Sequence, residues 1–158
     1  MDKTTLTTAM RTSISDVLET MFFLPIDYTE AAKIEGLWPA DQAGMLTARL
    51  DFKGPLTGHC LLFMPEQLAV DITADFLGED PESLSDEQSH GTVNEIINMI
   101  VGNAFSLLDP QAVFDLGIPS LVSFGENYAG SADGDKEIFM ALDTLENQLA
   151  IRVHIVSP

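Results

Sequence analysis

The chain has 158 residues, a length typical of one domain with a sizeable buried core. It carries 25 acidic and 7 basic residues, a formal net charge of −18, which argues against nucleic acid and anionic membrane surfaces as partners. The single cysteine, Cys60, excludes an intrachain disulfide and a thiolate metal cage, and the apolar run at 21–26 is too short to span a bilayer. We therefore expect one cytoplasmic domain over 1–158, whose acidity favours either partners with basic patches or simple solubility.

The N-terminal segment predicts an amphipathic helix over 3–24. Apolar side chains recur there at helical spacing, and Pro25 prevents the helix from continuing. The residues on this face are Leu6, Met10, Ile14, Val17, Leu18 and Met21. The pattern is looser at 28–38, where spaced apolar residues indicate a short strand before a polar turn at 39–44.

A β-hairpin and a second helix follow. Polar and apolar side chains alternate at 45–52, Lys53-Gly54-Pro55 predicts a turn, and a mostly apolar run returns at 56–64. Pro65-Glu66 is typical of the start of a helix, because proline fits the first turn and an acidic side chain interacts favourably with the helix dipole. We expect this helix to end at Gly78.

The longest predicted helix contains the stretch Gly91–Leu108. An acidic loop at 79–88 precedes it, and Ser85 or Asp86 in that loop can cap the helix. Apolar residues of the stretch form one broad stripe, whereas small or polar residues occupy another face. The small or polar residues are Gly91, Glu95, Asn98, Gly102 and Ser106.

Three strand-like runs complete the chain, at 121–128, 137–142 and 148–156. Plausible turns lie at Asp133-Gly134 and Glu146-Asn147. Because the strands come as hairpins and not as βαβ crossovers, we predict an α+β fold, a largely antiparallel six-stranded sheet with long helices packed on it. Each half consists of a helix and about three strands, which suggests two pseudo-repeats.

Both predicted repeats carry a glutamate on the polar face of their first helix. The first half has Ser15-x3-Glu19-x2-Phe22, and the second half has Gly91-x3-Glu95-x2-Asn98. The spacing from Glu95 to Asn98 places a carboxylate and a carboxamide side by side on one face, although such residues often form only a solvated surface. Gly102 and Asn103 in the next turn are poor helix formers, glycine costing about 1 kcal/mol relative to alanine. We therefore expect a partner to approach this face closely, at Gly91, Gly102 and Asn103.

Other chemistry has little support in the sequence. It contains no nucleophile elbow, no zinc-protease motif and no glycine-rich phosphate loop. The spacing of His59, His90 and His154 does not favour a metal, and Asp133-Gly134-Asp135 lacks the remaining ligands of a calcium loop. Cys60 lies in an apolar strand and is expected to be a small buried hydrophobe. We expect no metal site and no intrinsic cofactor.

The stretch Glu95-Ile-Ile-Asn98-Met-Ile-Val-Gly102-Asn103, with the run at 17–22 and the downstream Pro119, resembles the CheC/CheX/FliY family of chemotaxis phosphatases. Length and layout are most similar to the CheX-like single-domain members. Glu95 and Asn98 match the two acting positions of the family motif, whereas Gly91 replaces its leading aspartate or serine. In the first half Ser15 and Glu19 match, but Phe22 replaces the asparagine, which implies a degenerate second site.

The resemblance implies that the chain hydrolyses the aspartyl phosphate of a phosphorylated CheY-like response regulator, whose own Mg2+ and lysine hold the phosphoryl group. Asn98 would orient the attacking water, because a carboxamide can donate and accept hydrogen bonds without carrying charge. Glu95 would pair with the regulator's lysine. The net charge of −18 gives no long-range steering toward an acidic phosphorylation site, so local contacts or a basic patch must guide docking.

Two other functions remain open from the sequence. One is a non-catalytic interaction module of the same fold, which binds a receiver, a flagellar switch protein or a second copy of itself. The other is a sensor with a small-ligand pocket between the sheet and the helices. Because CheX proteins are dimers, the resemblance also implies a possible homodimer, formed through an edge such as the 45–64 hairpin or the last strand.

Overall fold

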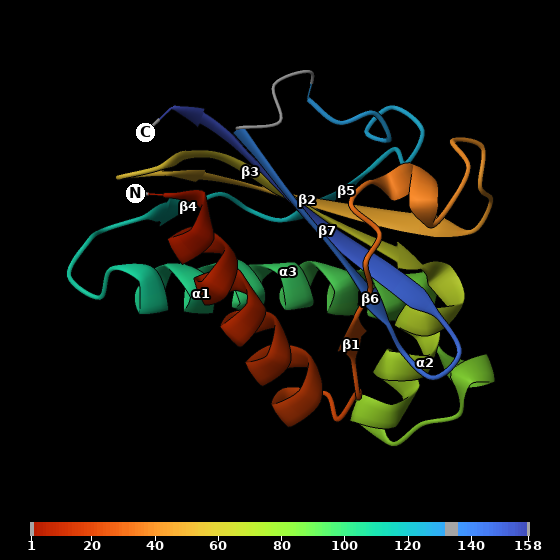
Figure 1. The fold of residues 1–158 in the computed structure, drawn as a ribbon. Helices are drawn as coiled ribbons and strands as arrows, with labels where there is room; N and C mark the ends of the chain where they lie inside the picture. The colour runs from red at the N-terminus through yellow and green to blue at the C-terminus, as the bar shows by residue number, and fades with distance from the viewer. Residues whose placement is uncertain (1, 132–135, 158) are drawn as a thin grey trace.

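The computed structural model describes residues 2–131 and 136–157, so the predicted turn at Asp133-Gly134-Asp135 lies outside the described residues. Groups of helices and groups of strands follow one another along the chain (Figure 1). The elements are α1 (Lys3–Ser15), the π-helix η1 (Asp16–Met21), β1 (Asp27–Tyr28), the 3-10 helix η2 (Ile34–Gly36), β2 (Met45–Lys53), β3 (Thr57–Pro65), α2 (Glu66–Leu77), the 3-10 helix η3 (Pro81–Ser83), α3 (Asp86–Leu108), β4 (Asp115–Leu116), β5 (Ser120–Val122), β6 (Glu137–Asp143) and β7 (Gln148–Ser157).

The strands form one antiparallel sheet in the order β1-β6-β7-β3-β2-β4, and β5 also pairs with β2. This arrangement confirms the predicted α+β class. The sheet has seven strands where six were expected. The additional strand is β4, which has only 2 residues and is too short to produce an alternating pattern in the sequence.

The short strands of each half of the chain pair with the hairpin of the other half. β1 of the first half pairs with β6 of the second half, and β4 and β5 of the second half pair with β2 of the first. The two hairpins meet at the centre, where β3 and β7 run antiparallel and His59 lies opposite His154. The sheet therefore has the pseudo-twofold arrangement expected of a duplicated unit of one helix, one short strand and one hairpin.

Three predicted elements differ in extent. The helix expected over 3–24 is α-helical only to Ser15, continues as a π-helix and ends at Met21. In place of a strand at 28–38, only Asp27–Tyr28 is a strand and Ile34–Gly36 is a 3-10 turn. The strand expected at 121–128 is restricted to Ser120–Val122. It ends early because the Ser123 hydroxyl accepts from the Glu126 N–H and the Asn127 amide donates to the Ser123 carbonyl, which favours a turn.

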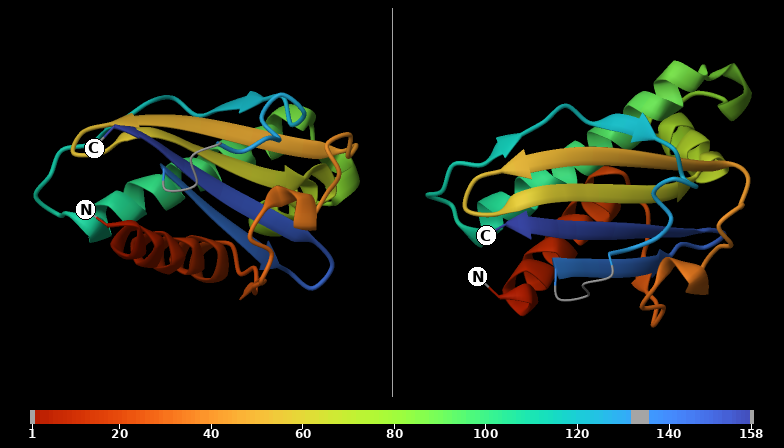
Figure 2. Two further views of the ribbon diagram at one scale, coloured as in Figure 1. Left: turned by 45° about the horizontal axis from the view of Figure 1, so that its top comes forward. Right: turned by 90° about the horizontal axis from the view of Figure 1, so that it is seen from above.

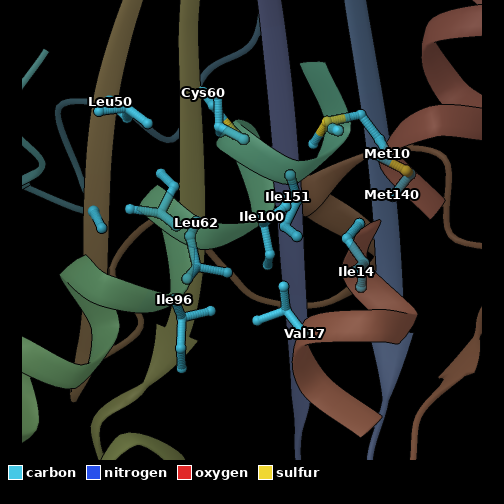
Figure 3. Close-up of a cluster of buried hydrophobic side chains, with 14 of the residues drawn as sticks. Met10, Ile14, Val17, Leu50, Cys60, Leu62, Ile96, Ile100, Met140 and Ile151 are labelled. Carbon is cyan, nitrogen blue, oxygen red and sulfur yellow. The ribbon is translucent and has the colours of Figure 1, made fainter. Parts of the chain in front are cut away.

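The α-helices cover one face of the sheet, as the view from above makes clear (Figure 2). Side chains from α1, η1 and α3 meet those of the long strands in the main core, including Ile14, Val17, Ile96, Ile100 and Leu62 (Figure 3). A smaller core on the opposite face is built from Ile34, Trp38, Leu61, Phe63, Phe124 and Ala150. The sheet is thus buried between two layers, with its helical side carrying the larger core.

Candidate functional site

α3 begins where the sequence predicts. The Ser85 hydroxyl accepts from the N–H of Gln88, and the Gln88 side chain accepts from the N–H of Ser85, which makes a complete capping box. The apolar stripe of the helix is buried at 1% exposure or less for Val93, Ile97, Ile100, Val101 and Ala104. Burial of this stripe fixes the rotation of α3 and presents its opposite face to the exterior.

A groove runs between η1 and α3, with a volume of about 430 Å³. We call it the η1–α3 groove. Asn98, Gly102 and Asn103 line it from α3, together with Met99. The opposite wall consists of Asp16, Val17, Thr20 and Met21. Three of the residues predicted to form the site therefore lie together in one hollow.

Glu95 and Asn98 differ in their surroundings. Asn98 is half-buried within the groove, whereas Glu95 is exposed on the same helix, one turn toward its N-terminus and outside the groove lining. Among residues 2–131 and 136–157, neither side chain has a hydrogen-bond or ion-pair partner. The carboxamide of Asn98 thus forms no hydrogen bond with the described core residues. Both its donor and its acceptor are available to a group of a docked partner.

The two glycines on this face are not required for packing against the residues that the structure describes. A Cβ atom at Gly91 would meet nothing within 4 Å, and one at Gly102 would make an ordinary contact of 3.7 Å with Leu116. Glycine inside a helix is destabilising by about 1 kcal/mol relative to alanine. The small residues therefore reduce helix stability without an internal gain, which is consistent with close approach by another molecule.

The corresponding positions of the first half form no comparable arrangement. Ser15 is half-buried and Glu19 is exposed, but Phe22 is 9% exposed and its ring packs against Phe76 at a centroid distance of 5.1 Å. In addition, the i→i+5 hydrogen bonding of the π-helix gives these residues other angular positions around the axis than an α-helix would. The position equivalent to Asn98 is therefore part of the apolar packing.

The second wall of the groove was not predicted from the sequence. Asp16 and Thr20 are exposed polar residues of the first helix, and Met21 is 47% exposed. In the sequence, Asp16 and Thr20 appear only as polar residues at positions i and i+4 of a helix. This pattern does not indicate which other helix packs beside them. Asp16 places a carboxylate across the groove from Asn98.

Other reactive side chains lie elsewhere. Burial raises the pKa of the Cys60 thiol to about 12, which confirms Cys60 as an inert core residue.

One carboxylate and histidine cluster was not predicted from the sequence. Oxygen or nitrogen atoms of the Glu66, Asp86 and His90 side chains lie within 4.8 Å of one another where α2 and α3 begin. None of these side chains lines the η1–α3 groove.

The chain matches a family model described as chemotaxis phosphatase CheX over residues 46–142. A search of curated proteins gives no match. Within the described part of the chain, no helix combines the length and apolar character needed to cross a membrane.

Several solved structures share the fold. The CheX–CheY–BeF3–Mg2+ complex from Borrelia burgdorferi contains a chain with a TM-score of 0.72 and 19% identity, covering 94% of this chain and 96% of that one. CheX from Vibrio vulnificus has a TM-score of 0.70 and 24% identity, with 95% of each chain covered. FliY from Thermotoga maritima has a TM-score of 0.58 and 17% identity, covering 94% and 84%. At these identities the likeness establishes the fold alone.

Proposed function

Because the CheX chemotaxis phosphatase model matches more than half of its residues, the chain belongs to that family, and we propose that it hydrolyses the aspartyl phosphate of a CheY-like response regulator. The fold it shares with the CheX chain of a CheX–CheY complex supports this class of partner. The observation that carries the proposal is the half-buried carboxamide of Asn98, which lies in an open groove and has no hydrogen-bond partner in the described part of the chain.

Asn98 is proposed to orient the attacking water. Its carboxamide accepts a hydrogen bond from water and donates another to a phosphoryl oxygen, yet it adds no negative charge beside the anionic phosphate. Half-burial on a packed helix restricts the motion of the side chain, so little entropy is lost when the water is positioned. Each tenfold acceleration requires about 1.4 kcal/mol, which orientation of one nucleophile can supply for an already labile acyl phosphate.

Glu95 is proposed to anchor the regulator's lysine. It lies three residues before Asn98, so the two Cβ atoms are about 5–6 Å apart on neighbouring positions of the helix surface. Its exposure allows a long cationic side chain to reach it from a docked partner. A carboxylate–ammonium hydrogen bond formed on docking would hold the two proteins in register.

The groove itself is unsuited to bind free phosphate. Asp16 lies on one wall and the whole chain has a net charge of −18, so an isolated anion is repelled. The proposed mechanism therefore leaves charge neutralisation to the Mg2+ and lysine of the regulator, and this chain supplies only the orienting carboxamide and the anchor. No cofactor of its own is needed for these two roles.

Phosphate release from a phosphorylated regulator in the presence of Mg2+ tests the proposal. We expect Asn98→Ala to abolish acceleration while binding is retained, and Asn98→Asp to do the same because its charge repels the phosphoryl group. Glu95→Ala should weaken binding of the regulator, whereas the control Glu87→Ala, an exposed glutamate two turns earlier in α3, should not. Binding without acceleration by the unmodified chain would overturn the proposal and favour a non-catalytic interaction module.

A further inference from the structure

A second hollow, lined by none of the residues of the η1–α3 groove, lies between α1, the segment 32–35 and β6. It has a volume of about 530 Å³, within the usual range of ligand pockets. One wall is a face of α1 formed by Lys3, Thr7 and Arg11, and another is the segment 32–35. Its floor is the first part of β6, residues 137–140. We call this hollow the β6 cleft.

Basic residues are concentrated around the β6 cleft. Lys3, Arg11, Lys33 and Arg152 line it, and among residues 2–131 and 136–157 two acidic residues do so as well. The acidic residues are Glu35 and Glu137. In a chain with a net charge of −18, this lining is a local positive surface that can attract an anionic group at short range.

The cations of the β6 cleft differ in their roles. Arg152 is 4% exposed, donates to the carbonyls of Asn127 and Tyr128 and pairs with Glu137 at 3.5 Å. Its role is therefore structural, because it links β7 to the segment after β5 and to β6. Lys33 and Arg11 are exposed, and the Arg11 guanidinium lies 4.4 Å from the centre of the Tyr28 ring. The aromatic ring holds Arg11 at the rim while leaving its N–H groups able to meet a ligand.

The floor of the cleft is an incompletely paired strand edge. β1 pairs with β6 only at Leu142 and Asp143, and the Thr29 N–H then donates to the carbonyl of Ala141. No described strand continues this pairing along 137–140. Because main-chain groups face the same side at every second residue, the N–H and C=O of Phe139 point toward this open edge.

We propose that the β6 cleft binds an extended acidic peptide segment of a protein partner, which adds as a strand to the edge of β6. The main chain of the peptide would pair with the exposed groups of Phe139, as in other cases of strand addition. Acidic side chains at alternate positions of such a strand lie on one face, about 6.7 Å apart, where they can meet the basic rim. This site is separate from the proposed phosphatase groove and does not depend on catalysis.

Fluorescence anisotropy with a labelled decapeptide of alternating glutamate and valine tests the site. The measurement is made at about 0.15 M salt, because interactions between charges more than about 8 Å apart are then largely screened. We expect saturable binding that Arg11→Glu or Lys33→Glu weakens at least tenfold. Lys53→Glu is the matched control, because Lys53 is exposed at the opposite edge of the sheet, and it should leave binding within twofold. Thermal unfolding of each variant verifies that it is folded.

Hydrogen exchange then distinguishes strand addition from simple anion binding. Saturating peptide should slow exchange of the Phe139 amide at least tenfold, and free glutamate at the same carboxylate concentration should not. Peptide binding that free glutamate displaces, without protection of Phe139, would show a small-anion site and overturn the proposal. No binding, or equal weakening by Lys53→Glu, would also overturn it.

Discussion

The Ser13 hydroxyl of α1 donates a 2.6 Å hydrogen bond to the main-chain carbonyl of Ile100 in α3. Both residues are buried, at 0% and 1% exposure. Ile100 is two residues beyond Asn98, and Ser13 is three residues before Asp16 on the opposite wall of the η1–α3 groove. This bond therefore links the two helices beside the groove and limits how far its walls can separate.

Ser13→Ala should lower the free energy of unfolding by about 1 kcal/mol, because a buried hydrogen bond between the helices is lost while the carbonyl keeps its bond within α3. Urea denaturation measures the change, with an unaltered m-value if the unfolded state is the same. Ser15→Ala is the control, since Ser15 is half-buried and has no side-chain capping bond. It should change the stability by less than about 0.5 kcal/mol. Equal effects of the two substitutions would contradict the role of the Ser13 bond.

Gly102→Ala should have opposite effects on stability and function. The added methyl group meets Leu116 at an ordinary 3.7 Å, so helix propensity should raise the free energy of unfolding by up to about 1 kcal/mol. The same methyl group enters the η1–α3 groove beside Asn98, and regulator dephosphorylation should slow. Ser106→Ala, one turn further along α3 and outside the groove lining, should not slow it. Full activity of Gly102→Ala would show that close approach at this position is unnecessary.

Local patterns predicted the hairpin, the capping box at Ser85 and the end of α2 at Gly78, because each depends on residues within a few positions of one another. The π-helix at 16–21 was not predictable. It depends on the packing of α1 and η1 against the rest of the main core, and the propensities of its residues suit an α-helix equally well.

The site was likewise only half predictable. The spacing of Glu95, Asn98 and Gly102 along one helix follows from its period, so one wall could be read from the sequence. The other wall, with Asp16 and Thr20, depends on how the helices pack, a contact about 80 residues apart in the chain that no local pattern encodes. The basic lining of the β6 cleft has the same origin, since Arg11 and Arg152 come from opposite ends of the chain.

Phe22→Asn should not create a second active site, although it completes the motif of the first half. Phe22 is buried against Phe76, so the substitution should destabilise the fold by about 3 kcal/mol through lost apolar burial and a newly buried amide. We expect the double variant Asn98→Ala/Phe22→Asn to remain inactive toward a phosphorylated regulator at a temperature where circular dichroism shows it folded. Restored phosphate release would contradict the assignment of the first half as degenerate.

Phe23→Gly should stabilise the protein. Phe23 has a φ of +54°, the left-handed conformation that glycine usually supplies after a helix, and its side chain is 83% exposed. Relief of this strain should raise the free energy of unfolding by about 1 kcal/mol. Phe23→Ala is the control, because it removes the ring but keeps the Cβ atom, and its stability should stay within about 0.5 kcal/mol of the unmodified protein. A similar gain in both variants would attribute the effect to the exposed ring and not to the backbone.

His59 should make stability depend on pH. The pKa of His59 is lowered from 6.5 to about 4, mainly by burial and in smaller part by the nearby Arg49 and His154, whereas Asp51 opposes the shift. The unfolded chain therefore takes up a proton at this position first as pH falls. The contribution of neutral His59 is fully present above pH 6.5 and is lost progressively between about pH 6.5 and 4.

His59→Asn removes this titration, and the difference in unfolding free energy between the unmodified protein and the variant isolates it. Each unit of pKa shift corresponds to about 1.4 kcal/mol, and because His59 is only half-buried we expect a total of about 1–2 kcal/mol. Urea denaturation from pH 7 to pH 4.5 should show the difference shrinking toward acid, since effects of the carboxylates cancel between the two proteins. A difference that stays constant or grows toward acid would mean that His59 is not held neutral by its position between β2 and β7.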